Sequence, residues 1–68
     1  METGKFIKSL LALNGMTITE LTPLLSGKTG EKYTGSGLTN KLWRNKITLA
    51  EAYAIAEILG YKIEFIKN

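Results

Sequence analysis

The first part of the chain arranges apolar and polar residues at the spacing of an α-helix. From residue 4 to residue 13 the apolar side chains recur every three or four positions, which predicts an amphipathic helix with one broad buried stripe. The pair Asn14 and Gly15 is typical of a helix end. The side chains expected to face the core are Phe6, Ile7, Leu10, Leu11 and Leu13.

A second helix is expected to begin at Ile18. Thr17 and Glu20 have the spacing of a capping box, in which the threonine hydroxyl accepts from the glutamate amide while the glutamate side chain reaches back. Pro23 removes one amide donor from this helix and crowds the preceding turn, so we expect a kink or a short, frayed helix that stops near residues 26–27. The side chains expected to face inward are Leu21 and Leu25.

A polar loop over residues 27–34 precedes a third helix, which starts with two glycines. Thr34 is the better N-cap, and this choice places Gly37 inside the helix with ordinary helical angles. Asn45 is a plausible left-handed stop. The side chains expected to share the buried side are Leu38 and Leu42.

The last part of the chain predicts a fourth helix followed by a strand. Thr48 and Glu51 repeat the capping-box spacing, and Gly60 is expected to end the helix. Residues 61–66 alternate apolar and polar side chains, which is the period of a β-strand that must find an edge. The fold class is therefore all-α, one domain over residues 1–68 with four helices and a short C-terminal β-strand. The inward face of the fourth helix is expected to hold Leu49, Ala52, Ile55, Ala56 and Leu59.

Composition narrows the class of protein. The 68 residues suffice for one small core, and they contain no cysteine and no histidine, so we expect no disulfide, no metal site and no cofactor. No apolar run has the length of a membrane span, and we find no targeting signal. The sequence favours a folded cytoplasmic protein without a membrane partner.

The charge is unevenly placed along the chain. The net charge is only +3, but residues 28–46 carry five bases against one acid, whereas the rest carries four bases against five acids. This surplus is either an ordinary solvated face or an electrostatic footprint for a polyanion, and we favour the polyanion.

Catalytic motifs are weak in this sequence. Residues 26–29, Ser-Gly-Lys-Thr, look like the end of a phosphate-binding loop, but position 22 is threonine where that loop needs glycine. Residues 35–37, Gly-Ser-Gly, could open a dinucleotide-binding turn, but the sixth position is Asn40. The acids are scattered and the serines have no histidine partner, so we expect no enzyme and no small-molecule substrate.

Three segments in order carry a family resemblance: residues 15–26 (GMTITELTPLLS), residues 33–47 (YTGSGLTNKLWRNKI) and residues 50–61 (AEAYAIAEILGY). Together they resemble the second, third and fourth helices of the helix-turn-helix DNA-binding family of the Cro and phage-repressor type, also called the XRE family. The resemblance covers residues 5–66. It implies a lambda-repressor-like domain that acts as a sequence-specific transcriptional regulator, a small phage or mobile-element repressor-like protein that binds the major groove of double-stranded DNA as a dimer.

The resemblance also implies roles for single residues, because in this fold the third helix enters the major groove with its N-terminal turn. Thr17 would give a phosphate its backbone amide. Thr34 and Gly35 open the third helix and are expected to lie at the DNA. The glycines either let the backbone approach DNA or simply make a loose junction. The residues expected to neutralise phosphates are Lys28, Lys32, Arg44 and Lys46. The residues expected at base edges are Ser36, Thr39, Asn40 and Lys41.

Two further questions concern partners. The strand from Lys62 to Ile66 is expected to form a symmetric homodimer by pairing with its mate or docking on its mate's helices. The alternative function is a helix-turn-helix scaffold used as a protein-binding or oligomerisation module without DNA binding.

Two positions are open for Trp43. Its ring would lie against DNA sugar or a partner subunit, or it would cover the seam between the third and fourth helices, and we favour the seam.

Overall fold

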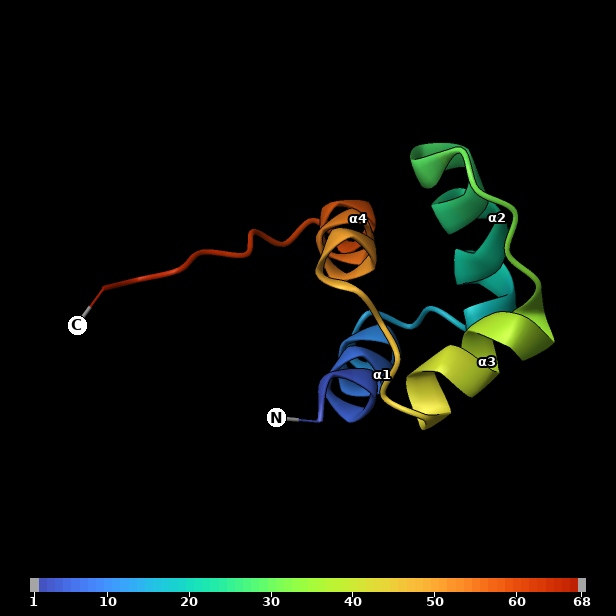
Figure 1. The fold of residues 1–68 in the computed structure, drawn as a ribbon, viewed down its shortest axis with the longest axis horizontal. Helices are drawn as coiled ribbons and strands as arrows, with labels where there is room; N and C mark the ends of the chain where they lie inside the picture. The colour runs from blue at the N-terminus through green and yellow to red at the C-terminus, as the bar shows by residue number, and fades with distance from the viewer. Residues whose placement is uncertain (1, 68) are drawn as a thin grey trace.

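The computed structural model describes residues 2–67 and contains four α-helices over that range. Helix α3 packs against both α1 and α2, and α4 packs against α2 (Figure 1). The prediction of an all-α body with four helices is therefore confirmed. The helices are α1 (Thr3–Leu13), α2 (Ile18–Thr29), α3 (Gly35–Trp43) and α4 (Leu49–Leu59).

The predicted C-terminal β-strand is wrong. Residues 61–67 form an extended arm that leaves the end of α4 and runs away from the helices, and residues 2–67 contain no strand (Figure 1). Within residues 2–67 the arm is bonded to the helices only at its root, where the Tyr61 amide donates to the Ala56 carbonyl at 2.8 Å and the Asn14 side-chain amide donates to the Tyr61 hydroxyl at 3.0 Å. A strand needs the backbone of a neighbouring edge, and an all-helical body supplies none.

Threonine N-caps begin three of the four helices, as predicted. Each threonine hydroxyl accepts from the amide three residues on, at 3.0 to 3.1 Å. Gly37 lies within α3 and does not have a positive φ angle, so its predicted helical conformation is confirmed. Asn45 has a φ of 56°, which confirms the left-handed stop. The three caps are Thr17, Thr34 and Thr48.

Helix α2 is longer than the sequence predicts. It continues through Pro23 and Gly27 to Thr29, and Gly30 ends it with a left-handed φ of 76°. Its last turn is held by tertiary contacts, because Leu25 is fully buried and the Lys28 ammonium lies 2.7 Å from a carboxylate oxygen of Glu57 on α4. Burial of Leu21 and Leu25 on either side of the proline offsets its local cost, so the expectation of a short, frayed helix was wrong.

The core is narrower than the apolar pattern suggests. Phe6 is 54% exposed, Leu13 is 77% exposed and Leu49 is 57% exposed, although all three were expected to face inward. Helix α1 buries only the row that faces α3, at the spacing of Gly4, Ile7 and Leu11. The buried apolar cluster consists of Ile7, Leu11, Leu21, Leu25, Leu38, Leu42, Ala54 and Ile55.

Gly4 lets the start of α1 reach the end of α3. A Cβ atom at this position would overlap the carbonyl oxygen of Leu42. The Gly4 amide donates to the side-chain oxygen of Asn45 at 2.8 Å, which satisfies one of the free amides in the first turn of α1. Asn45 therefore ends α3 with its backbone and caps α1 with its side chain.

We expect Gly4→Ala to lower the free energy of unfolding by at least about 2 kcal/mol, because two backbones must separate to admit the methyl group. The matched control is Gly27→Ala, an exposed position inside α2 where an added Cβ meets no atom within 4 Å. That control should stabilise the protein by about 0.5–1 kcal/mol. Urea unfolding measures both changes, and equal stability of the two variants would contradict the close approach of α1 and α3.

Candidate nucleic-acid interface

The outward side of α3 is polar and exposed. Ser36, Thr39 and Asn40 are all exposed, whereas Leu38 and Leu42 on the opposite side belong to the core. The Thr39 hydroxyl donates to the Gly35 carbonyl at 2.8 Å and keeps its acceptor capacity. Asn40 presents both an amide donor and a carbonyl acceptor, which is the pair that can bond adenine in the major groove. Three of the four predicted base-edge residues thus share one accessible face.

The first turn of α3 is open to solvent. Thr34 uses its hydroxyl to accept from the Gly37 amide at 3.0 Å, and the next amide, that of Leu38, donates to the Thr34 carbonyl. Within the part of the chain that the structure describes, the amides of Gly35 and Ser36 have no hydrogen-bond partner. A Cβ at Gly35 would meet nothing within 4 Å, so no side chain crowds these two donors.

Gly37 is not required by the cap itself. An added Cβ would lie 2.8 Å from the Thr34 hydroxyl oxygen, which is tight. The same position in α2 and in α4 is a glutamate, and the corresponding threonine bonds there are 3.1 Å long. A side chain at this position is therefore compatible with a threonine cap, and the glycine leaves the outer surface of the first turn bare.

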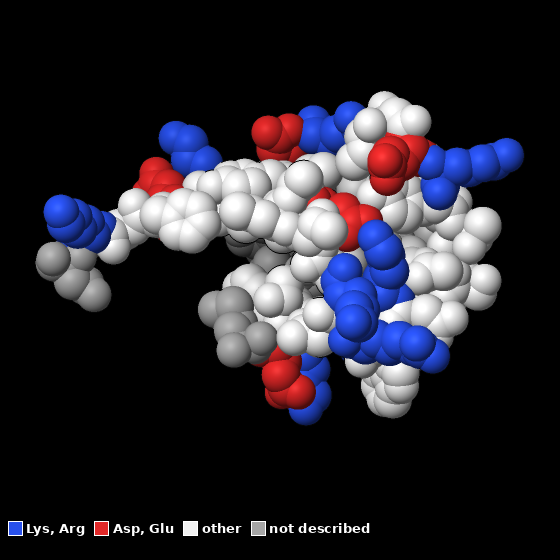
Figure 2. All heavy atoms as spheres, viewed as in Figure 1, with Lys and Arg blue, Asp and Glu red and all other residues white. Residues whose placement is uncertain are grey.

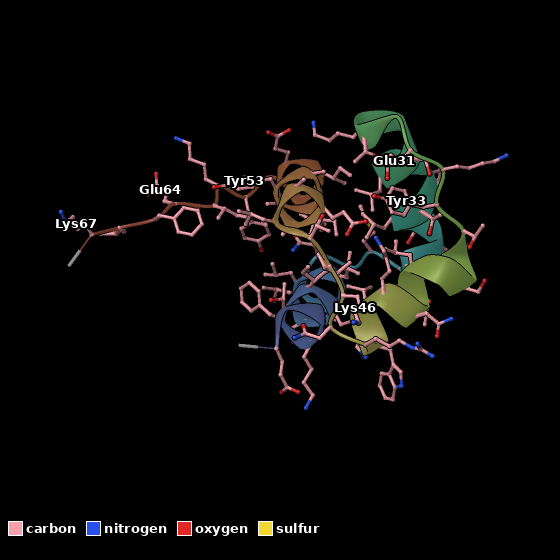
Figure 3. The ribbon with its side chains drawn as sticks, in the orientation of Figure 1. Glu31, Tyr33, Lys46, Tyr53, Glu64 and Lys67 are labelled. Carbon is pink, nitrogen blue, oxygen red and sulfur yellow. The ribbon has the colours of Figure 1, made fainter. Side chains whose placement is uncertain are left out.

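Lys41 differs from the other predicted base-edge residues because its ammonium points toward α4. It lies 2.6 Å from Oε2 of Glu51, whose side chain is only 6% exposed. The Tyr33 hydroxyl donates to the same carboxylate oxygen at 2.7 Å, and the Thr48 amide donates to the other oxygen at 2.9 Å. Figure 3 shows Tyr33 on the segment between α2 and α3. We call this cluster of Tyr33, Lys41, Thr48 and Glu51 the Glu51 hub.

The Glu51 hub changes two pKa values. Burial by itself raises the pKa of Glu51, but hydrogen bonds from Lys41, the Thr48 amide and Tyr33 outweigh that effect and lower the pKa to about 2. Burial and the hydrogen bond to Glu51 raise the pKa of Tyr33 to about 12. Lys41 is therefore the counter-ion of a buried carboxylate, and a DNA contact would have to compete with that pairing.

The predicted phosphate ligands divide into two groups. Lys28 pairs with Glu57, as described above, whereas Lys32, Arg44 and Lys46 are exposed and form no ion pair within residues 2–67. Figure 2 shows lysine and arginine side chains gathered over α3 and the segment that follows it. Figure 3 places Lys46 in that following segment. The exposed bases without an ion pair therefore precede α3 in the chain at Lys32 and follow it at Arg44 and Lys46.

The backbone amide and the hydroxyl of Thr17 are already hydrogen-bonded within the protein. Its amide donates to Oε1 of Glu20 at 3.0 Å, and its hydroxyl both donates to that oxygen and accepts from the Glu20 amide. The hydrogen bonds from the Thr17 amide and then from its hydroxyl lower the pKa of Glu20. The capping box thus satisfies the backbone donor that the sequence assigned to DNA.

The prediction that Trp43 covers the seam between the third and fourth helices is wrong, and its neighbour Lys8 was not among the predicted site residues. Trp43 is 76% exposed and does not cover a seam between α3 and α4. The Lys8 ammonium from α1 lies 4.5 Å from the centroid of its ring. No local signal links residues 35 positions apart in sequence, because their contact depends on how α1 crosses α3.

Comparison with protein-family models, curated proteins and solved structures finds no match for this chain. In residues 2–67 no helix is long and apolar enough to cross a membrane, and no group of acidic residues could hold a metal ion. Any assignment of function therefore rests on the geometry of the described residues and on the sequence.

We expect the protein to lose stability as the pH falls from about 4.5 to about 2. The pKa of Glu51 in the folded protein is depressed below its ordinary value of 4.5, so its contribution to stability is complete above pH 4.5 and disappears as the pH approaches about 2. In Glu51→Gln the melting temperature should depend less steeply on pH across this range, and the remaining pH dependence should come partly from Glu20. The Tyr33 contribution should persist to about pH 10 and be lost as the pH approaches 12.

The control for this prediction is Glu57→Gln, which removes a surface ion pair whose carboxylate side chain is 62% exposed. At neutral pH it should cost at most about 1 kcal/mol, whereas Glu51→Gln should cost about 1–3 kcal/mol because Lys41 loses its partner. If the two variants have equal stability and equal pH dependence, the Glu51 hub does not hold the helices together.

Proposed function

We propose that this protein binds double-stranded DNA in a sequence-specific manner and acts as a transcriptional regulator of the phage or mobile-element repressor type. The observation that carries the proposal is the outward face of α3, where Ser36, Thr39 and Asn40 are exposed. Basic side chains gather beside this helix and over the segment that follows it (Figure 2). The resemblance of residues 5–66 to the Cro and phage-repressor family supports the same assignment. Helices α2 and α3 would be the helix-turn-helix pair.

Base reading is assigned to the side chains with free donors and acceptors. Asn40 is the best candidate for a bidentate contact with adenine, and Ser36 and Thr39 offer hydroxyls to either kind of base. The uncrowded amides of Gly35 and Ser36 would approach a phosphate or a base edge at the positive end of the helix dipole. Lys41 is left out of this set because its ammonium forms an ion pair with the Glu51 carboxylate.

Phosphate binding is assigned to Lys32, Arg44 and Lys46. Each is exposed and free of a protein counter-ion within residues 2–67, so binding DNA breaks no existing pair. Lys28 is left out because its ammonium already pairs with Glu57. Three contacts per protomer would neutralise the phosphates on either side of the groove that α3 enters.

A homodimer is proposed through the C-terminal arm, with the arm of one copy docked on the helices of its mate. Phe65 is 78% exposed and Ile66 is 80% exposed, at the far end of an arm that lies clear of the helices (Figure 1). Burial of these two side chains would add apolar area that a 68-residue core lacks. A two-fold dimer would present two α3 helices to half-sites about one DNA turn apart.

The second candidate function is protein binding by the same scaffold without DNA. The exposed apolar surface of Trp43 and of the arm favours it, because large exposed apolar side chains commonly mark protein contacts. Binding to duplex DNA at low salt separates the two functions, since only the first requires it.

We expect salt-dependent binding to a mixed-sequence duplex, with a slope of log affinity against log salt near −3 per protomer for three phosphate contacts. Lys46→Ala and Lys32→Ala should each reduce the slope by about one and weaken binding to all sequences alike. Fluorescence anisotropy of a labelled duplex measures both effects.

The matched control is Lys28→Ala, which removes the same charge from a residue paired with Glu57 and should leave the slope unchanged. Asn40→Ala should keep the slope but reduce the sequence preference found by selection from random duplexes, by about 1–3 kcal/mol. Absence of binding to any duplex at low salt would rule out the DNA-binding proposal.

For the dimer, we expect Phe65→Ser with Ile66→Ser to weaken self-association at least about tenfold, because apolar burial worth about 1.4 kcal/mol or more is lost. Sedimentation equilibrium measures the association, and circular dichroism should show an unchanged helical fold since both side chains are exposed in the single chain. The control is Lys67→Ser in the same arm. An unchanged dimer in the double variant would place the interface elsewhere.

A further inference from the structure

Trp43 extends the outward stripe of α3 to the C-terminal end of the helix. It lies three positions after Asn40 and seven after Ser36, which is the spacing of residues on one helix face. With 76% of its surface exposed, it leaves one of the largest apolar side chains of the chain in water. Such exposure has no benefit for folding, so the ring is available for a ligand that approaches this face.

Lys8 holds one face of the indole ring. Its ammonium lies 4.5 Å from the ring centroid, within the range of a cation–π interaction, and it reaches the ring from α1. The two side chains line an open hollow of about 230 Å³ between the start of α1 and the end of α3, together with Glu2, Lys5, Leu42 and Asn45. One face of the ring is therefore positioned by the protein, and most of its remaining surface is free.

The charges around the hollow favour an anionic ligand. Lys5 and Lys8 line it, and Arg44 follows Trp43 directly, whereas Glu2 is the only acid among the lining residues. Glu2 lies 3.7 Å from Lys5 in an exposed pair, so it offsets that lysine and leaves Lys8 and Arg44 uncompensated. An apolar ring with one cation held against its face and a second cation next to it in the chain suits a ligand that has a sugar between two phosphates.

We propose that Trp43, Lys8 and Arg44 form a clamp for the sugar–phosphate backbone of duplex DNA beside the groove that α3 enters. The indole packs against a deoxyribose, and the ammonium and the guanidinium pair with the phosphates on its two sides. The inference rests on the proposed DNA-binding function and adds α1 to the interface. The clamp contributes affinity and orientation without reading bases, since sugars and phosphates are the same in every sequence.

The test uses the intact protein and a mixed-sequence duplex at low salt. Trp43 is the only tryptophan, so its emission reports on this site alone. We expect that emission to change on addition of duplex, with the same midpoint as the anisotropy of a labelled duplex. Trp43→Ala should weaken binding about tenfold, the size of one aromatic stacking contact, and Trp43→Phe should lose less. Sequence preference should stay the same in both variants.

In the clamp Lys8 is a fourth phosphate contact, which makes the expected slope about −3.6 per protomer. Lys8→Met removes the charge but keeps the apolar stem, and it should make that slope shallower by about one. The control is Leu13→Ala, which removes an apolar side chain that is as exposed as Trp43, at 77%, and lies at the other end of α1. Neither the control's affinity nor its slope should change. Thermal melts should confirm that all four variants remain folded.

The outcomes separate the clamp from the function on which it rests. If the wild-type protein binds duplex but Trp43 emission, Trp43→Ala affinity and Lys8→Met slope are unaffected, the clamp is wrong and DNA binding stands. If Trp43→Ala instead changes only self-association, the ring is a protein contact. If the wild-type protein binds no duplex, both proposals fail together, and the low-salt titration identifies that case directly.

Discussion

The arrangement of this domain depends on one buried carboxylate. Glu51 lies inside the protein where three segments meet, and each segment supplies it with a hydrogen bond: Tyr33 from the loop, Lys41 from α3 and the Thr48 amide at the start of α4. A carboxylate without such partners would be strongly unfavourable in this position. The requirement to satisfy it therefore fixes how α3 and its preceding loop lie against α4.

The same carboxylate determines which residues α3 can present to a ligand. By drawing Lys41 inward, Glu51 leaves an outward stripe of small polar side chains that ends in Trp43. The positive charge that remains free lies before and after this stripe, at Lys32, Arg44 and Lys46. Neutral polar side chains on α3 and cations in the two flanking segments separate the reading of bases from the binding of phosphates, which are distinct tasks in DNA recognition.

A second junction positions α1. Gly4 and Asn45 bring the first turn of α1 against the end of α3, and this contact sets Lys8 beside Trp43. The glycine has a packing role here, since any Cβ would separate the two backbones. The junction connects the core to the surface, because a loss of close approach at Gly4 would also move the cation that holds the indole ring.

Local sequence signals determined the helices of this protein. The threonine caps, the capping boxes at Glu20 and Glu51 and the stops at Gly15, Asn45 and Gly60 are local backbone chemistry, and all were predictable. The outward set of Ser36, Thr39 and Asn40 followed from helical spacing in the same way.

Tertiary structure alone decided the rest, because the remaining features depend on partners far away in the chain. Helix α2 continues past Pro23 because Leu21 and Leu25 are buried in the core, and residues 61–67 form no strand because the body offers no edge. Leu13 and Leu49 are apolar but exposed. The period of apolar residues shows which side chains share one helix face, but it does not show how much of that face a neighbouring helix covers. Lys41 and Lys28 looked like DNA ligands until α4 supplied their counter-ions, and Trp43 acquired its neighbour Lys8 only when α1 crossed α3.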